Sequence, residues 1–233
     1  MGQGSIYVVL TVKHFWAVQR LVTSWNAEGK WKVMKMDWTG NANSIFATHG
    51  ASNHSETERA ELDYYATDPE AVEKLLEVEE FFHYILEPAC GGGHIAEVLL
   101  KHGYEVFCSD IVNRGYEKQA MTEDFLHWNP SSRNSHDIIT NPPYSKAKEF
   151  VEHALCISQE SVKVAMFLKL TFIEGKKRKE LFDKYPPKTI YVFTNRIDCW
   201  KNGTKPEKAS KAVCYAWFVW EKGWTGDTVI KRI

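Results

Sequence analysis

The stretch Tyr84–Asp110, YILEPACGGGHIAEVLLKHGYEVFCSD, decides the fold that the sequence predicts. It opens with a short apolar run, which is followed by glycines at positions 91, 92 and 93. Ile95–Lys101 then has the apolar spacing of a helix, and Tyr104–Cys108 is typical of a second strand. A strand, a glycine turn, a helix and another strand form the unit from which open, mostly parallel sheets are built.

The same alternation continues on both sides of this unit. We expect helices over Pro69–Phe82, Ser145–Ile157 and Glu174–Lys184, and strands over Asp137–Thr140 and Val162–Leu170. Two β-rich runs follow, Thr189–Thr194 and Val213–Trp220, with no helix between them, which favours an antiparallel pair at one edge. The sequence therefore predicts an α/β domain over residues 61–233, preceded by an extension of uncertain structure over residues 1–60.

The bulk composition is that of an ordinary globular protein. The 233 residues are 44% hydrophobic and 25% charged, and the formal net charge is −1. This charge argues against a protein that coats nucleic acid, although a local basic face remains compatible with it. The five cysteines include no C-x-x-C pair, which indicates a reduced, cytoplasmic protein without a cysteine zinc site. The apolar run Ile6–Val12 is too short to cross a bilayer, so neither a membrane anchor nor a signal peptide is expected.

The glycine turn and the acids behind it suggest a cofactor site. Glycines allow a backbone to approach a ligand closely, and ligands bind at the strand ends of such sheets. Asp110 ends the next strand, about 20 residues later, where a carboxylate can accept hydrogen bonds from ribose hydroxyls. Asp124-Phe125, which we place after a further helical segment, pairs a carboxylate with an aromatic ring that could hold an adenine. A plain strand–helix turn, a loop aspartate and a helix cap are the alternative interpretations.

The strongest chemical signal is Asn141-Pro142-Pro143-Tyr144, directly after a predicted strand. Two prolines stiffen the backbone and remove two N–H donors, which leaves acceptors available. An exocyclic NH₂ group has two hydrogens to donate, and the Asn141 side-chain oxygen and the Pro142 carbonyl can accept one each. Tyr144 could stack on a flat target group. A proline-rich turn is the alternative.

With these residues in place, the sequence resembles the amino-methyltransferases that carry an NPPY motif, most closely the small bacterial and phage DNA N6-adenine methyltransferases. The resemblance covers roughly residues 60–221, and the run from Leu168 through Arg196 favours the DNA adenine enzymes. It implies a catalytic role for Asn141, Pro142, Pro143 and Tyr144. It implies cofactor contacts from Tyr65, Thr67, Glu87, Pro88, Ala89, Gly91, Gly93, Asp110, Ile111, Asp124, Phe125 and Asn141. One departure is that Asp68 separates Thr67 from the proline that the family usually has next.

The resemblance also implies a fold and a reaction. The fold is a Rossmann-like seven-stranded sheet, mostly parallel, with an antiparallel C-terminal hairpin. The cofactor is S-adenosylmethionine, the product is S-adenosylhomocysteine, and no metal is expected because the sulfonium methyl group is already activated. The expected substrate is adenine N6 in DNA, in the cytoplasm of a bacterial or phage-infected cell. RNA adenine or guanine and protein glutamine present a similar NH₂ group and stay open, as does a cofactor-binding module without catalysis.

Two lysine-rich segments follow strand ends and could form a basic rim around the predicted pocket. The first consists of Lys176, Lys177, Arg178 and Lys179. The second contains Lys201, Lys205, Lys208 and Lys211, with Trp200 at its base. We expect these residues to contact nucleic acid phosphates and Trp200 to stack on a flipped base. Solvated lysines and a packed tryptophan are the alternative.

Overall fold

The computed structural model describes residues 8–14, 17–25, 31–35, 64–130, 132–205, 207 and 213–233. The chain divides into two units, residues 1–53 and 54–233, each considered by itself. The expected boundary at residue 60 lies outside the described residues. In the first unit, strands β1 (Val8–His14), β2 (Ala17–Trp25) and β3 (Trp31–Lys35) form an antiparallel sheet in that order.

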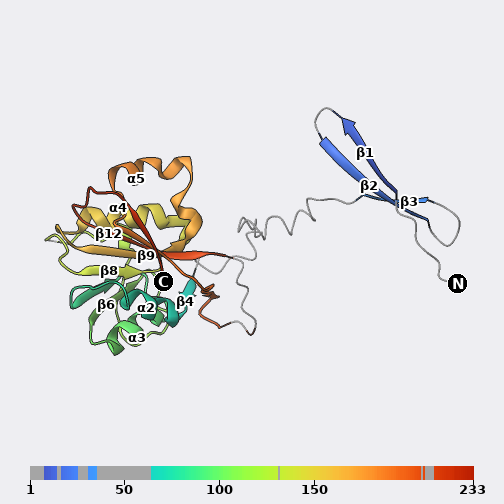
Figure 1. Cartoon of the computed structure of the whole chain (residues 1–233). Coiled ribbons are helices and arrows are strands. Elements are labelled where there is room, and N and C mark those ends of the chain that lie inside the picture. Colours follow the sequence, from blue (N-terminus) through green and yellow to red (C-terminus); the bar gives the residue numbers. More distant parts are fainter. Residues whose placement is uncertain are drawn as a thin grey trace. The chain divides into compact units, whose positions relative to one another are not determined.

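The second unit is built on one mixed sheet of eight strands in the order β13-β10-β12-β9-β8-β5-β6-β7 (Figure 1). Its strands are β5 (Tyr84–Glu87), β6 (Glu105–Asp110), β7 (Gln119–Thr122), β8 (Asp137–Thr140), β9 (Lys163–Lys169), β10 (Thr189–Val192), β12 (Tyr215–Glu221) and β13 (Val229–Arg232). Strands β5 to β9 are parallel, and β12 runs antiparallel to both β9 and β10. The predicted α/β sheet with a reversed strand near its end is confirmed.

Helices cover both faces of this sheet (Figure 1). They are α2 (Pro69–Leu76), α3 (His94–Lys101), α4 (Ala147–Ile157) and α5 (Lys179–Lys184). The central strand β9 sends Met166 into one core, shared with α4 and α5, and Phe167 into the other, shared with α2 and α3. Because alternate side chains of a strand point to opposite faces, a strand covered on both sides is apolar throughout.

Several predicted elements differ in extent. The predicted helix over Pro69–Phe82 ends at Leu76, because the segment after it is held elsewhere: the Phe82 amide donates to Asp137 at 2.6 Å, and Lys163 pairs with Glu79. The predicted helix over Glu174–Lys184 is divided into a 3-10 helix, η6 (Lys176–Arg178), and α5.

The segment before Asp124 was predicted to be helical and is instead strand β7. All of its residues are at least partly exposed. Because neither face of this strand is buried, its sequence need not alternate apolar and polar residues. Strand β13 adds an eighth strand beside β10, beyond the seven expected. A separate two-stranded pair joins β4 (Tyr65–Thr67) to β11 (Cys199–Lys201), and this pair was not predicted. Asp68 caps α2 by accepting from the Glu70 amide, which explains its place before Pro69.

Candidate active site

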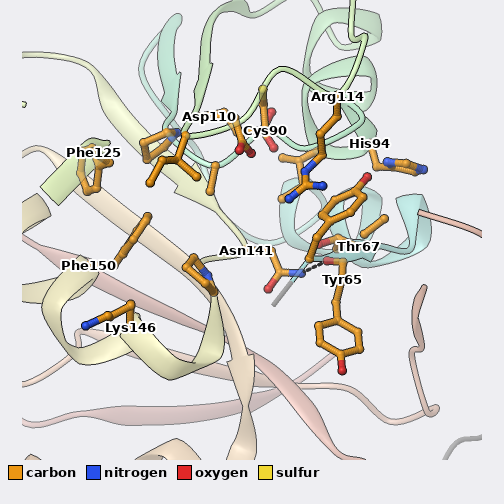
Figure 2. A pocket seen from close by; sticks show the side chains of 18 of the residues that line it. Tyr65, Thr67, Cys90, His94, Asp110, Arg114, Phe125, Asn141, Lys146 and Phe150 are labelled. Carbon is orange, nitrogen blue, oxygen red and sulfur yellow. Dashed lines mark hydrogen bonds between the residues drawn. The ribbon is translucent and has the colours of Figure 1, made fainter. Parts of the chain in front are cut away.

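A pocket with an empty volume of about 890 Å³, part of it open to solvent, lies beside the carboxyl ends of β5, β6 and β8 (Figure 2). The structure brings most of the predicted cofactor and catalytic residues to its wall. These are Tyr65, Thr67, Glu87, Pro88, Ala89, Asp110, Ile111, Asp124, Phe125, Asn141 and Pro143. The other predicted residues do not line the pocket, although each lies within a few positions of a lining residue in the sequence: Gly91, Gly93, Pro142 and Tyr144.

The glycine turn is fixed by hydrogen bonds within the protein. The Gly91 amide donates to Asp110 Oδ2 at 2.8 Å, and the Val112 amide donates to Asp110 Oδ1 at 2.9 Å. The amides of Cys90 and Gly93 donate to the carbonyls of Ser109 and Cys90. Asp110 therefore ties the glycine turn to the end of β6, and its carboxylate, only 6% exposed, still lines the pocket.

Tyrosine rings, rather than empty space, lie against the glycines. Gly91 and Gly93 have φ values of 55° and 80°. A Cβ atom at Gly91 would lie 2.2 Å from the ring of Tyr64, and one at Gly93 would lie 2.3 Å from the ring of Tyr116. Only glycine combines this backbone conformation with such close neighbours. The hydroxyl of Tyr64 in turn accepts a hydrogen bond from the Gly92 amide at 2.9 Å.

The apolar end of the pocket contains Phe125, with Phe150 beside it (Figure 2). Their ring centroids are 5.1 Å apart, and Phe125 is only 3% exposed. Asp124 caps the 3-10 helix η3 (Phe125–His127) by accepting from the Leu126 amide at 3.0 Å, and it also pairs with His127. Asp124 is therefore a helix cap and Phe125 a core residue, as the alternative interpretation held. Both residues also line the pocket.

Two buried oxygens on residues that line this pocket have no partners among the described residues. They are Glu87 Oε2 and Thr67 Oγ1, on side chains that are 1% and 2% exposed. Burial raises the pKa of Glu87 well above its usual range, which favours the protonated carboxyl group. Burial also lowers the pKa of His94, which lines the pocket and stays neutral.

The Asn141 amide is oriented by one hydrogen bond. Its Nδ2 donates to the Tyr65 carbonyl at 2.7 Å, which Figure 2 shows as a dashed line. Because the amide nitrogen is held by β4, the oxygen on the other branch faces away from that carbonyl, as an acceptor in the pocket wall. The Pro143 carbonyl is occupied by the Lys146 amide at 2.8 Å.

Tyr144 lies in an aromatic group behind Asn141. Its ring is 5.8 Å from that of Tyr65 and 6.0 Å from that of Tyr215, and Lys169 Nζ lies 5.2 Å from its centroid. Its hydroxyl lies 3.2 Å from Cys199 Sγ, and burial raises the pKa of that thiol to about 12. Cys199 is therefore a neutral thiol next to the predicted catalytic segment.

The predicted basic rim is divided by the structure. Arg178 donates to the carbonyls of Phe172, Thr171 and Glu174, and Lys179 pairs with Asp183, so both hold their own segment together. Lys176 and Lys177 are exposed. None of these four residues lines the pocket.

The second part of the rim is attached to the pocket wall. Strand β11 pairs with β4, with Lys201 opposite Tyr65 and Trp200 opposite Ala66. Trp200 packs edge-on against His94, and Lys205 Nζ lies 5.3 Å from the Trp200 ring centroid. Lys208 and Lys211 lie outside the described residues.

Several pocket residues were not predicted from the sequence, notably Tyr64, His94, Arg114 and Lys146. Arg114 follows Asp110 by four residues, and Tyr64 directly precedes Tyr65. Their position in the sequence near predicted cofactor contacts is the feature from which a role could have been predicted. Within the part of the chain that the structure describes, no group of three or more His, Cys, Asp or Glu residues could hold a metal ion. No described helix is long and apolar enough to cross a membrane.

The chain has the fold of the class I S-adenosylmethionine-dependent methyltransferases, shared with known structures at low sequence identity. A protein described as such an enzyme, from Listeria monocytogenes, aligns with a TM-score of 0.52 and 14% identity over 83% of this chain and 74% of its own. A protein from Agrobacterium tumefaciens described as an O-methyltransferase aligns with a TM-score of 0.52 and 12% identity over 71% of this chain and 85% of its own. The type IIG restriction endonuclease BpuSI aligns with a TM-score of 0.50 and 14% identity over 77% of this chain and 27% of its own. No protein-family model and no curated protein sequence matches the chain.

Proposed function

We propose that residues 61–233 form an S-adenosylmethionine-dependent methyltransferase domain that methylates an exocyclic amino group, adenine N6 in DNA. The observation that carries this proposal is the Asn141 amide, fixed by its 2.7 Å hydrogen bond to the Tyr65 carbonyl. A fixed amide whose oxygen is an acceptor in the pocket wall suits an NH₂ donor.

The pocket fits the cofactor. Phe125 and Ile111 offer an apolar slot for an adenine ring, and Asp110 offers a carboxylate where the ribose hydroxyls would lie. The unpartnered oxygens of Glu87 and Thr67 give the wall polar groups that a ligand can satisfy. Tyr65, Pro88 and Ala89, which the resemblance also implies as cofactor contacts, line the same pocket.

The chain's own residues supply orientation and charge stabilisation. When bound, the cofactor supplies a methyl group on a positively charged sulfur. Asn141 Oδ1 and the Pro142 carbonyl accept the two hydrogens of the target NH₂ group and stabilise the positive charge that grows on its nitrogen. Tyr144 stands beside Asn141 as a ring on which the flat target could stack. A target inside a duplex must first be flipped out.

The choice of DNA rests on the sequence resemblance, and the likeness of fold to a restriction endonuclease agrees with it. The test is transfer of radiolabelled methyl groups from S-adenosylmethionine to unmethylated DNA, to RNA and to a protein extract. We expect label in DNA. Label in RNA or protein alone would replace DNA by one of the alternatives, and label in none of the three would favour a cofactor-binding module.

If the β11 part of the rim contacts phosphates, the double variant Lys201→Ala/Lys205→Ala should bind DNA more weakly whatever the sequence. Each lost phosphate contact should flatten the dependence of log affinity on log salt concentration by roughly 0.9. DNA titrations at several salt concentrations measure this slope. The matched control is Lys231→Ala/Arg232→Ala, two exposed cations on edge strand β13. Equal slopes for both double variants would remove β11 from the DNA interface.

A further inference from the structure

Arg114 is a cation in the pocket wall that has no role in the proposed reaction. It lies in the loop after β6, and Figure 2 shows its guanidinium group between Asp110 and His94. Its Nε atom is buried and has no hydrogen-bond partner among the described residues. A buried guanidinium N–H without an acceptor is costly, so Arg114 keeps an unused donor beside the pocket.

The guanidinium group lies over an aromatic ring. Arg114 Cζ lies 4.3 Å from the ring centroid of Tyr64. That ring is itself fixed, because its hydroxyl accepts from the Gly92 amide and its backbone carbonyl accepts from the Asn202 amide at 3.1 Å. The planar donor fork of Arg114 is therefore preorganised beside the glycine turn.

The glycine turn has no amide left to bind an anion. The amides of Cys90, Gly91, Gly92 and Gly93 all donate within the protein. The other cationic side chain on the pocket wall is Lys146, which lies on the far side of Asn141 and is 3.8 Å from Glu149 (Figure 2). Of these two lining cations, Arg114 is therefore the one placed to bind an anionic group next to the glycine turn.

S-adenosylmethionine has one anionic group, the α-carboxylate of its methionine part. Asp110 is the expected ribose contact, and Arg114 stands beyond it on the side of the pocket away from Phe125 (Figure 2). A guanidinium fork pairs with a carboxylate through two parallel hydrogen bonds. We propose that Arg114 binds this carboxylate and that Tyr64 orients Arg114 for it. The inference rests on the proposed function, because it concerns the same cofactor.

Two ligands that differ in the methionine part test the inference by calorimetry. S-adenosylhomocysteine carries the carboxylate, whereas 5′-methylthioadenosine keeps the adenosine and sulfur but lacks the amino acid. Arg114→Met should weaken S-adenosylhomocysteine binding by about 10- to 100-fold and change 5′-methylthioadenosine binding by less than about threefold. Arg114→Lys keeps the charge without the fork and should lose less. Arg232→Met, the same change on the exposed edge strand β13, should alter neither affinity.

The outcomes separate the inference from the function on which it rests. Equal losses for the two ligands, no loss for either, or a loss of DNA affinity alone would overturn the carboxylate contact. Thermal unfolding without ligand reports whether Arg114→Met folds. If it does not, the ratio of the two affinities in Arg114→Lys decides, and an unchanged ratio contradicts the inference. A wild-type protein that binds neither ligand at millimolar concentration would reject the proposed function itself.

Discussion

Replacing Asn141 with alanine is expected to lower the rate of methyl transfer by about 10²- to 10³-fold, the usual effect of removing one group that stabilises transition-state charge. In the proposed reaction its oxygen accepts from the target NH₂ group, whereas its nitrogen donates to the Tyr65 carbonyl at 2.7 Å. The affinity for S-adenosylhomocysteine should stay within about threefold, because this acceptor stabilises the target nitrogen and not the bound cofactor product. Initial rates and calorimetry measure the two quantities.

The control for this variant is Asn129→Ala, the same chemical change at an exposed position outside the pocket wall. It should retain wild-type transfer. Transfer by Asn141→Ala at a rate close to that of Asn129→Ala would remove Asn141 from the catalytic step. A large loss of cofactor affinity in Asn141→Ala would instead show that the residue contacts the cofactor or holds β4 in place.

Gly91→Ala should have the second large effect, and Gly103→Ala separates its two causes. Both glycines have positive φ, 55° and 85°, so either alanine should cost about 1–2 kcal/mol in the free energy of unfolding. A Cβ atom at Gly103 meets nothing within 4 Å, whereas one at Gly91 collides with Tyr64. Gly91→Ala should therefore also displace Tyr64 and disturb the Gly91–Asp110 hydrogen bond.

The resulting loss of affinity for S-adenosylhomocysteine should be on the order of 100-fold for Gly91→Ala and absent for Gly103→Ala. Chemical unfolding and calorimetry on the two variants measure both effects. If the two variants lose the same stability and neither loses affinity, the contact between Tyr64 and the glycine turn has no part in cofactor binding.

The elements predicted correctly are those whose pattern is local. Strand β5, the glycine turn, α3 and β6 follow one another in a single stretch, and the apolar run of β9 reflects burial on both faces. The antiparallel pairing of β10 and β12 followed from the lack of a helix between two β-rich runs. Strand β7 was missed because its residues are exposed at the sheet edge, where no alternation is required.

The parts of the site that depend on contacts between residues far apart in the sequence could not be predicted. Cys199 lies beside Asn141 and Tyr144 although 58 and 55 residues separate them in the chain. The pairing of β4 with β11, which places Trp200 near the pocket, has strands of three residues with no distinctive pattern. The motif predicted that Asn141 is an acceptor, whereas the Tyr65 carbonyl that orients its amide is seen only in the fold.

The measurement that tests the central claim most directly is the chemical identity of the methylated product. Unmethylated DNA is incubated with the protein and S-adenosylmethionine that carries a deuterated methyl group, digested to nucleosides and analysed by mass spectrometry. We predict deuterated N6-methyldeoxyadenosine with the wild-type protein and only traces with Asn141→Ala. Label on deoxycytidine or deoxyguanosine, or unlabelled DNA beside labelled RNA or protein, would contradict methylation of adenine N6 in DNA.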